Sequence, residues 1–164
     1  MGLLQLVLSL ATFLCSLVTG FLFAFAVVVM PGIKKLNDRE FIRAFQTMDG
    51  IIQNNQPIFV VVWLGSAVAL IVAAVLGVGH LDATGSWFLT VSTLAYLLGV
   101  QLPTIAINVP LNNKLQSLNV DAIDEAAREA AREAFEERWN RWNVVRTVVS
   151  CLVSLLLIVL VLRI

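Results

Sequence analysis

Four long apolar stretches constrain the fold of this chain more than any other feature. They cover about residues 3–30, 58–78, 87–109 and 144–162, and each is long enough to cross a hydrocarbon core, which takes about 20 helical residues. Lipid offers no hydrogen-bond partners, so such a stretch crosses as a helix. Only 13% of the residues are charged and 59% are hydrophobic, which is unlike a soluble domain. We therefore predict an all-α chain, a membrane four-helix bundle forming one domain over residues 1–164.

The basic residues predict the orientation of these spans. The connections 31–57 and 110–143 carry most of the Lys and Arg side chains, whereas residues 79–86 and the N-terminal flank carry none. The positive-inside rule places both basic connections in the cytoplasm. The first stretch lacks a basic leader and a small-residue cleavage site, so we interpret it as a retained span. We expect an integral protein of the bacterial inner membrane with both termini outside the cytoplasm.

The connection 31–57 contains a helix signal of its own. Asn37 followed by Glu40 fits a capping box with Asn in place of Ser or Thr. Apolar side chains then recur on one face of a helix, at Phe41, Phe45, Met48 and Ile52. This pattern predicts a short amphipathic helix at the cytoplasmic membrane surface, and Pro57 would open the second span.

The connection 110–143 predicts an extension of the last helix. Asp121 is a suitable N-cap, and Glu125 with Arg128 is the first of several acid-then-base pairs at helical spacing. No Gly or Pro interrupts the chain from there into the fourth span. We therefore expect one long last helix that runs from the cytoplasm into the bilayer.

Polar side chains lie inside spans where lipid cannot satisfy them. At about 100° per residue, five residues of the third span fall on one side of its helix, namely Thr90, Thr93, Gln101, Thr104 and Asn108. Pro103 also removes a backbone hydrogen bond and frees the carbonyl of Gly99. The last helix carries a matching stripe of Trp139, Asn143, Arg146, Ser150 and Ser154. We expect the two stripes to meet in the cytoplasmic half of the bundle.

This meeting point is the candidate site. Polar groups buried in membrane bundles are costly and often functional. The polar cluster also includes Asn55. We predict ligand-binding roles for Gln53, Asn54, Gln101, Thr104, Asn108, Asn112, Trp139, Trp142 and Asn143. Arg146 and Asp49 are the candidate catalytic residues. Arg146 shares the polar face of the last helix, and Asp49 is the candidate base because it is the only carboxylate near the segment 51–57. The alternative is that these groups bond only to each other and to freed backbone, which would lock the bundle.

The sequence lacks the residues that several kinds of functional site require. No Asp or Glu lies inside the four stretches, which argues against a proton relay through the bilayer. His80 is the single histidine, and no Cys, His or carboxylate cluster has metal-ligand spacing. There is no nucleotide-binding loop and no basic run with interleaved aromatics. We therefore expect no metal, no cofactor and no nucleic-acid partner.

Four motifs in order along the chain point to a family: "VMPGI", "FIRAFQTMDGIIQNNQP", "TIAINVPLNNKL" and "RWNRWNVVRT". Together they resemble the anthrone-oxygenase-like family of small four-span membrane proteins, whose bacterial members are mostly a domain of unknown function. The resemblance implies a four-helix membrane bundle with no metal or organic cofactor. Some fungal relatives are linked to the oxygenation of anthrones to anthraquinones. The matching positions are Pro31, Gln46, Asn54, Pro57, Asn108, Pro110, Asn112, Trp139, Trp142, Asn143 and Arg146.

The resemblance leaves more than one function open. A cofactor-independent oxygenase, or a binder, would take a flat, apolar, aromatic or quinol-like small molecule. A non-catalytic membrane protein would use its polar cluster only to hold the bundle together and its charged helix to dock a partner or a second copy. A transporter fits least, because no inverted repeat is evident. Besides the lipid bilayer, the partners to test are such a small molecule and a second copy in a homo-oligomer. A cavity lined by Gln101, Asn108, Asn143 and Arg146 would favour the first function.

Overall fold

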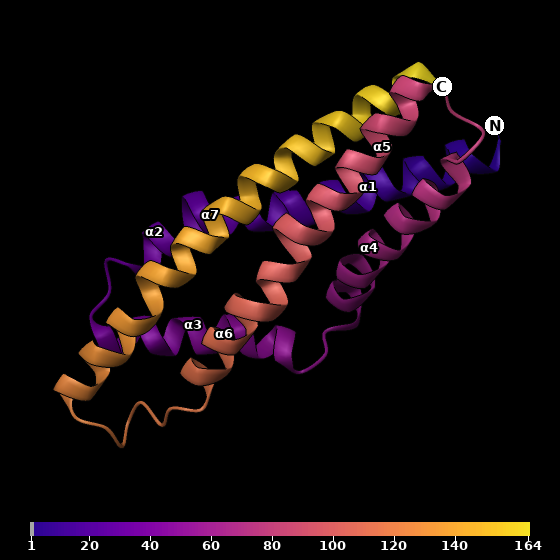
Figure 1. The fold of residues 1–164 in the computed structure, drawn as a ribbon. Coiled ribbons are helices and arrows are strands. Elements are labelled where there is room, and N and C mark those ends of the chain that lie inside the picture. Colours follow the sequence, from indigo (N-terminus) through magenta and orange to yellow (C-terminus); the bar gives the residue numbers. More distant parts are fainter. Residues whose placement is uncertain (1) are drawn as a thin grey trace.

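A computed structural model describes residues 2–164, which form five continuous helices joined by short connections (Figure 1). The first is α1 (Leu3–Ala24), which continues through the π-helical η1 (Phe25–Val29) into α2 (Met30–Ile33). Next come α3 (Asp38–Gln53) and α4 (Pro57–Gly77). The fourth comprises α5 (Ala83–Tyr96), η2 (Leu97–Gln101), η3 (Thr104–Asn108) and α6 (Val109–Gln116), and the fifth is α7 (Glu125–Arg163).

Four of these helices are long and apolar enough to cross a membrane, namely Leu3–Ile33, Pro57–Gly77, Ala83–Gln116 and Glu125–Arg163. The all-α prediction and the four apolar helices are confirmed, and they indicate an integral membrane protein. The third of them extends well beyond the predicted range 87–109 at both ends. At the C-terminal end polar residues of α6 continue the helix past the apolar stretch, and at the N-terminal end Asp82 caps the helix so that it begins at Ala83.

The long helices lie side by side, and the two ends of the bundle differ (Figure 1). The helix α1 packs on α4 and α7, and α5 packs on α7 and α4. Both termini and the connection 78–82 lie at one end. At the other end, α3 lies across the bundle and contacts α6 and the first half of α7 (Figure 1). We call this second end the charged end.

Local signals start most of these helices where the sequence indicates. The Asn37 side chain accepts a hydrogen bond from the Glu40 backbone N–H at 3.0 Å, which confirms the predicted cap of α3. Pro57 is the first residue of α4, also as predicted. The preceding turn contains Asn55 in the left-handed region, with φ of 58°, a conformation that asparagine adopts more readily than most residues.

The predicted N-cap at Asp121 is wrong. The helix α7 begins at Glu125, and Asp124 caps it by accepting the Ala127 N–H at 2.8 Å. The carboxylate of Asp121 instead pairs with the guanidinium groups of Arg39 and Arg43 on α3. Sequence spacing could not reveal that contact, because the two arginines lie far away along the chain.

Each proline inside a long helix follows a π-helical segment. Pro31 follows η1, Pro103 follows η2 and Pro110 follows η3. A proline ring clashes with the carbonyl four residues earlier and supplies no N–H, and a wider π turn is a known local adjustment in α-helices that is frequent at functional sites. The residue just after each segment donates its N–H to the segment's first carbonyl, for example from Val109 to Thr104.

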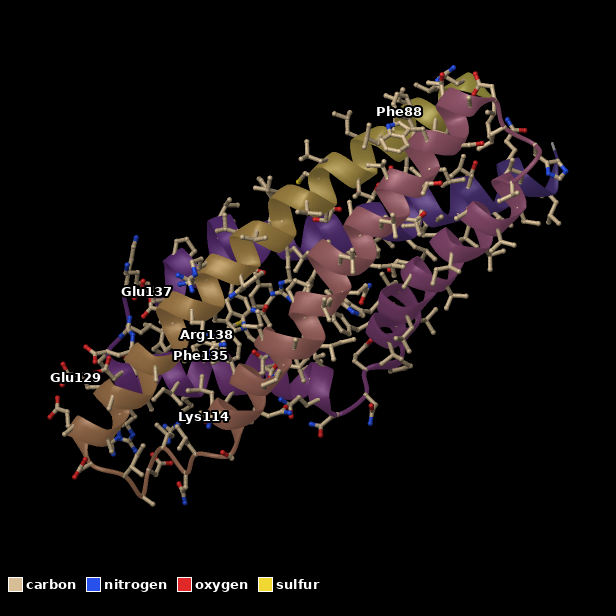
Figure 2. The ribbon with its side chains drawn as sticks, viewed as in Figure 1. Phe88, Lys114, Glu129, Phe135, Glu137 and Arg138 are labelled. Carbon is tan, nitrogen blue, oxygen red and sulfur yellow. The ribbon has the colours of Figure 1, made fainter. Side chains whose placement is uncertain are left out.

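Two apolar clusters hold the fold. One fills the bundle between α1, α4, α5 and α7, around Leu8, Leu70 and Leu157. The other fixes α3 to α6 and α7 at the charged end, around Phe41, Phe45 and Phe135. In Figure 2, Glu129 and Glu137 lie on the outer side of α7, whereas Phe135 lies between α7 and α3. The amphipathic α3 is thus anchored through aromatic contacts.

Candidate functional site

A cavity of about 290 Å³ lies where the bundle meets α3. All five continuous helices contribute to its wall, and its size is close to the lower end of the range for small-molecule pockets, about 300–1,000 Å³. Its aromatic lining consists of Phe21, Phe25, Phe45, Phe59, Trp63 and Trp139. Its polar lining consists of Asp49, Gln101, Thr104, Asn108, Asn112, Asn143 and Arg146. Aromatic walls with a few convergent polar groups are the usual composition of a ligand site.

The structure brings most of the predicted site residues to this one cavity. Asp49, Arg146 and six of the predicted ligand-binding residues line it. The other three do not, and neither does Asn55 of the polar cluster. Gln53 reaches it only through a hydrogen bond to Asp49, Trp142 is half-buried outside the lining, and Asn54 and Asn55 are exposed in the turn after α3.

Sequence reasoning missed four aromatic residues of the wall, Phe21, Phe25, Phe59 and Trp63. They form two pairs, each four residues apart on one helix. The ring centroids lie 4.8 Å apart in Phe21 and Phe25, and 5.5 Å apart in Phe59 and Trp63. Inside an apolar span such a pair looks the same whether it faces lipid or a cavity. The only sequence signal for a place in the cavity wall was proximity to a proline, Pro31 for the first pair and Pro57 for the second.

Arg146 lies at the centre of the site and has no carboxylate partner. Its side chain is 4% exposed. Nη1 donates to Thr104 Oγ1 at 2.9 Å and Nη2 donates to Asn143 Oδ1 at 3.0 Å. Its guanidinium carbon lies 5.8 Å from the centroid of the Trp139 ring. Within residues 2–164 no carboxylate pairs with it, so neutral dipoles and one aromatic face hold a buried positive charge.

Three polar atoms of the lining are buried without any partner: Gln101 Nε2, Asn108 Oδ1 and Arg146 Nε. An unsatisfied buried polar group costs about 1–3 kcal/mol. Gln101 and Asn108 belong to the π-helical segments η2 and η3. Two donors and one acceptor in the lining residues are therefore covered by neighbouring atoms and lack a protein partner.

Asp49 is buried and accepts three amide hydrogen bonds. Asn112 Nδ2 donates to Oδ1 at 2.8 Å, while Gln53 Nε2 and Gln116 Nε2 donate to Oδ2 at 2.7 and 3.1 Å. Trp139 Nε1 donates in turn to Asn112 Oδ1 at 2.8 Å. A carboxylate has about four acceptor positions. One position therefore remains, on Oδ1.

Ion pairs outside the cavity hold the charged end in place. Arg132 of α7 donates to Asp38 and Glu136 and to the carbonyls of Lys34 and Leu36, which ties the start of α3 to α7. The hydrogen bond from Arg39 lowers the pKa of the exposed Asp121 carboxyl below its usual value. These contacts keep α3 beneath the cavity.

In the part of the chain that the structure describes, no three His, Cys, Asp or Glu side chains lie close enough together to hold a metal ion. That the protein works without a metal or an organic cofactor stays a prediction.

The fold and the cavity define a class: a small all-helical protein with four potential membrane spans and an aromatic-lined polar pocket at one end. Comparison with protein families narrows this class. The family model described as anthrone oxygenase matches residues 52–156. This is more than half of the chain, so the chain belongs to the anthrone oxygenase family, and the resemblance inferred from the four motifs is confirmed. No curated protein and no solved structure matches the chain.

The family match covers α4 through most of α7. It therefore includes the cavity residues Gln101, Asn108, Trp139 and Arg146. It begins after Asp49, which lies on α3.

Proposed function

We propose that this protein is a membrane-embedded oxygenase that acts on a flat, apolar aromatic ketone of the anthrone type without a metal or organic cofactor. One observation carries the proposal. The aromatic cavity contains a buried guanidinium that no carboxylate neutralises, and its Nε has no partner. Such a group stabilises negative charge that develops on a substrate oxygen in a site from which water is excluded.

The shape and chemistry of the wall support this substrate class. Rings of a polycyclic ketone would pack against Phe25, Phe59, Trp63 and Trp139, where aromatic contacts add to the burial of apolar area. The ketone oxygen would lie beside the guanidinium of Arg146, which lines the cavity. A membrane protein is well placed for such a substrate, because the molecule dissolves in lipid.

The reaction can be written with all atoms in balance. Asp49 Oδ1 accepts a proton from the methylene carbon opposite the ketone, and Arg146 stabilises the resulting enolate. The enolate carbon passes two electrons to O₂ and forms a C–O bond, and the proton returns from Asp49 to give a hydroperoxide. Loss of water breaks the O–O bond and leaves a second ketone. One oxygen atom of O₂ thus enters the anthraquinone and the other leaves as water.

The same proposal includes a location in the membrane. All Lys and Arg residues other than Arg146 and Arg163 lie at the charged end, in or beside α2, α3, α6 and the first part of α7. The positive-inside rule supports a cytoplasmic charged end, with both termini on the outer face of a bacterial inner membrane. Reporter fusions at Ile164 test this: an alkaline phosphatase fusion should be active and a green fluorescent protein fusion dark, and the reverse result would overturn the orientation.

Oxygen uptake tests the reaction. We would reconstitute the protein in lipid vesicles, add anthrone and follow O₂ consumption together with anthraquinone absorbance. The expected result is one O₂ consumed per anthraquinone formed, at a rate well above that of empty vesicles. The variant Arg146→Met should lose this rate, whereas Arg138→Met, an exposed arginine on the same helix, should keep it. A folded wild-type protein that neither binds anthrone nor consumes O₂ would contradict the proposal.

One observation favours a second candidate function, that of a non-catalytic membrane protein. The amides around Asp49 donate to its carboxylate and to the backbone, as expected for groups that only hold helices together. Native mass spectrometry of protein from its own membrane separates the two. A co-purifying aromatic molecule that disappears in Asn108→Leu and Arg146→Leu supports a binding site. Loss of thermal stability alone, with nothing bound in wild type, supports the structural role. The mass of the intact species also tests the predicted homo-oligomer.

A further inference from the structure

The exposed part of the cavity wall lies on one side only. Among the lining residues of the described chain, three are exposed at the protein surface: Leu64 at 60%, Ile105 at 68% and Val109 at 42%. All three are aliphatic. Leu64 belongs to α4, whereas Ile105 and Val109 belong to the turn where η3 passes into α6. The mouth of the cavity therefore lies between α4 and the long helix that contains η3.

This mouth lies at the depth of the membrane hydrocarbon. The helix α4 has 21 residues, so it is about 31 Å long and only just crosses a hydrocarbon core of about 30 Å. Leu64 is two turns into α4, about 10 Å from its start. Its neighbours on the outer face, Val61 and Val68, are also exposed and apolar. Lipid tails, and not water, therefore border the opening.

The other sides of the cavity are lined by buried or half-buried side chains. At the charged end, α3 covers it with the buried side chains of Phe45 and Asp49, and Asn112 and Gln116 of α6 hold Asp49 by hydrogen bonds. Behind α7, a second hollow shares only Asn143 with the cavity. That side chain is 1% exposed and bonds both the Leu22 carbonyl and Arg146, so it forms a fixed wall.

A hollow on the face between α1 and α4 is separated from the cavity by aromatic rings. Phe21 contacts Phe59 edge to face at 5.2 Å, and Phe59 stacks on Trp63. These three residues line both spaces and fill the gap between them. The gap between Leu64 and the pair Ile105 and Val109 is thus the one side on which the wall is both aliphatic and exposed.

We propose that the cavity is loaded laterally from the bilayer, through a portal formed by Leu64 on one side and Ile105 and Val109 on the other. The inference rests on the proposed function only in requiring that the cavity binds a flat apolar molecule. The portal residues select membrane-dissolved molecules by width, while the polar residues deeper in the cavity recognise oxygen atoms.

Binding kinetics in vesicles test the portal. The probe is 9,10-anthraquinone, which dissolves in lipid, is not consumed, and accepts electrons from excited indole rings. Binding in the cavity would therefore quench Trp63 and Trp139, which line it. Stopped-flow mixing of protein vesicles with probe-loaded vesicles gives association and dissociation rates, and a titration gives Kd. Vesicles without protein and vesicles with unrelated membrane protein correct for quenching in the bilayer.

The variants narrow the portal and leave the polar residues untouched. We would compare Leu64→Phe and Ile105→Phe, singly and combined, with the matched controls Val68→Phe on α4 and Leu102→Phe on the third long helix. The control positions are exposed to a similar degree but lie outside the cavity lining. Phenylalanine adds no indole fluorescence. Each variant must keep the wild-type thermal midpoint in detergent to enter the comparison.

A narrowed portal raises the barrier for entry and exit alike. In the double Phe variant both rates should therefore fall by about tenfold, with Kd nearly unchanged. Leu64→Ala should raise both rates, and the two controls should match wild type. If wild type binds the probe but the Phe variants keep both rates, or change Kd through the dissociation rate alone, the portal is wrong and the proposed function stands. If wild type shows no saturable quenching, the cavity does not bind such molecules and both proposals fail.

Discussion

Replacing Arg146 by methionine separates a catalytic guanidinium from a structural one. Methionine has a similar length and suits an apolar wall. The substitution removes the hydrogen bonds to Thr104 and Asn143, at 2.9 and 3.0 Å. Bonds to a charged group contribute about 1.5–3 kcal/mol each, so the loss is about 3–6 kcal/mol. It also removes an ion buried without a counter-charge, whose burial costs several kcal/mol.

These two contributions nearly cancel. We therefore expect the free energy of unfolding of Arg146→Met to lie within about 2 kcal/mol of wild type, and it can be higher. Turnover is a different matter. Removing one donor to a developing oxyanion usually lowers kcat by about 10²–10³-fold. The expected variant is thus a stable protein with almost no anthrone oxidation.

Two measurements on the same preparation check this result. Titration with sodium dodecyl sulfate in mixed micelles, followed by circular dichroism, gives the free energy of unfolding, and O₂ uptake in vesicles gives turnover. Arg138→Met is the matched control and should be unchanged in both. A loss of more than about 4 kcal/mol of stability in Arg146→Met would refute the reasoning, because the bonds to neutral partners would then outweigh the burial cost. A stable variant with full turnover would refute the catalytic role.

Three further predictions concern other parts of the molecule. Asp49→Asn removes the proposed proton acceptor, so kcat for anthrone should fall by about 10²–10⁴-fold; a folded variant with full kcat in the O₂ assay would exclude Asp49 as the base. A Cβ at Gly99 would lie 2.8 Å from Val149 Cγ1, so Gly99→Ala should lower the free energy of unfolding by about 1–3 kcal/mol. Gly32 has open space around its Cβ position, so Gly32→Ala should not lower the free energy of unfolding. Equal effects of the two substitutions in the detergent titration would contradict this packing. The pKa of Asp121 is lowered in the folded state. Its ion pairs with the two arginines of α3 therefore stabilise the structure at a pH above the unfolded-state pKa of about 3.9. This stabilisation is lost as the pH falls through the lower folded-state pKa. Hydrogen exchange in residues 117–124, corrected for its intrinsic pH dependence, should therefore stay constant from pH 7 to about 5 and rise only below about pH 4; a rise already near pH 6 would contradict the assignment.

Local chemistry determined much of this fold in advance. The four apolar stretches required helices because lipid satisfies no backbone group. Asn37 specified where α3 begins by accepting the N–H of Glu40, three residues on. Pro57 specified where α4 begins because its fixed φ suits the first helical position, and Gln56 before it caps the helix. Helical periodicity alone placed Gln101, Thr104 and Asn108 on one face and Asn143 with Arg146 on another, and both faces line the same cavity.

Other features depend on contacts between residues far apart in the chain, and only the tertiary structure decided them. Asp121 has the local signature of an N-cap, yet it pairs with arginines of α3 that come close only after folding. A tryptophan in an apolar run can face either lipid or a cavity. Trp63 faces the cavity because of how the neighbouring helices are arranged around it. The sequence indicates that Pro103 frees a carbonyl. It does not indicate the π-helical segments on either side of Pro103, to which the cavity residues Gln101 and Asn108 belong. The sequence thus determined which helices form and which faces are polar. Packing determined which polar atoms remain unpaired, because a hydrogen-bond partner is a property of position in space.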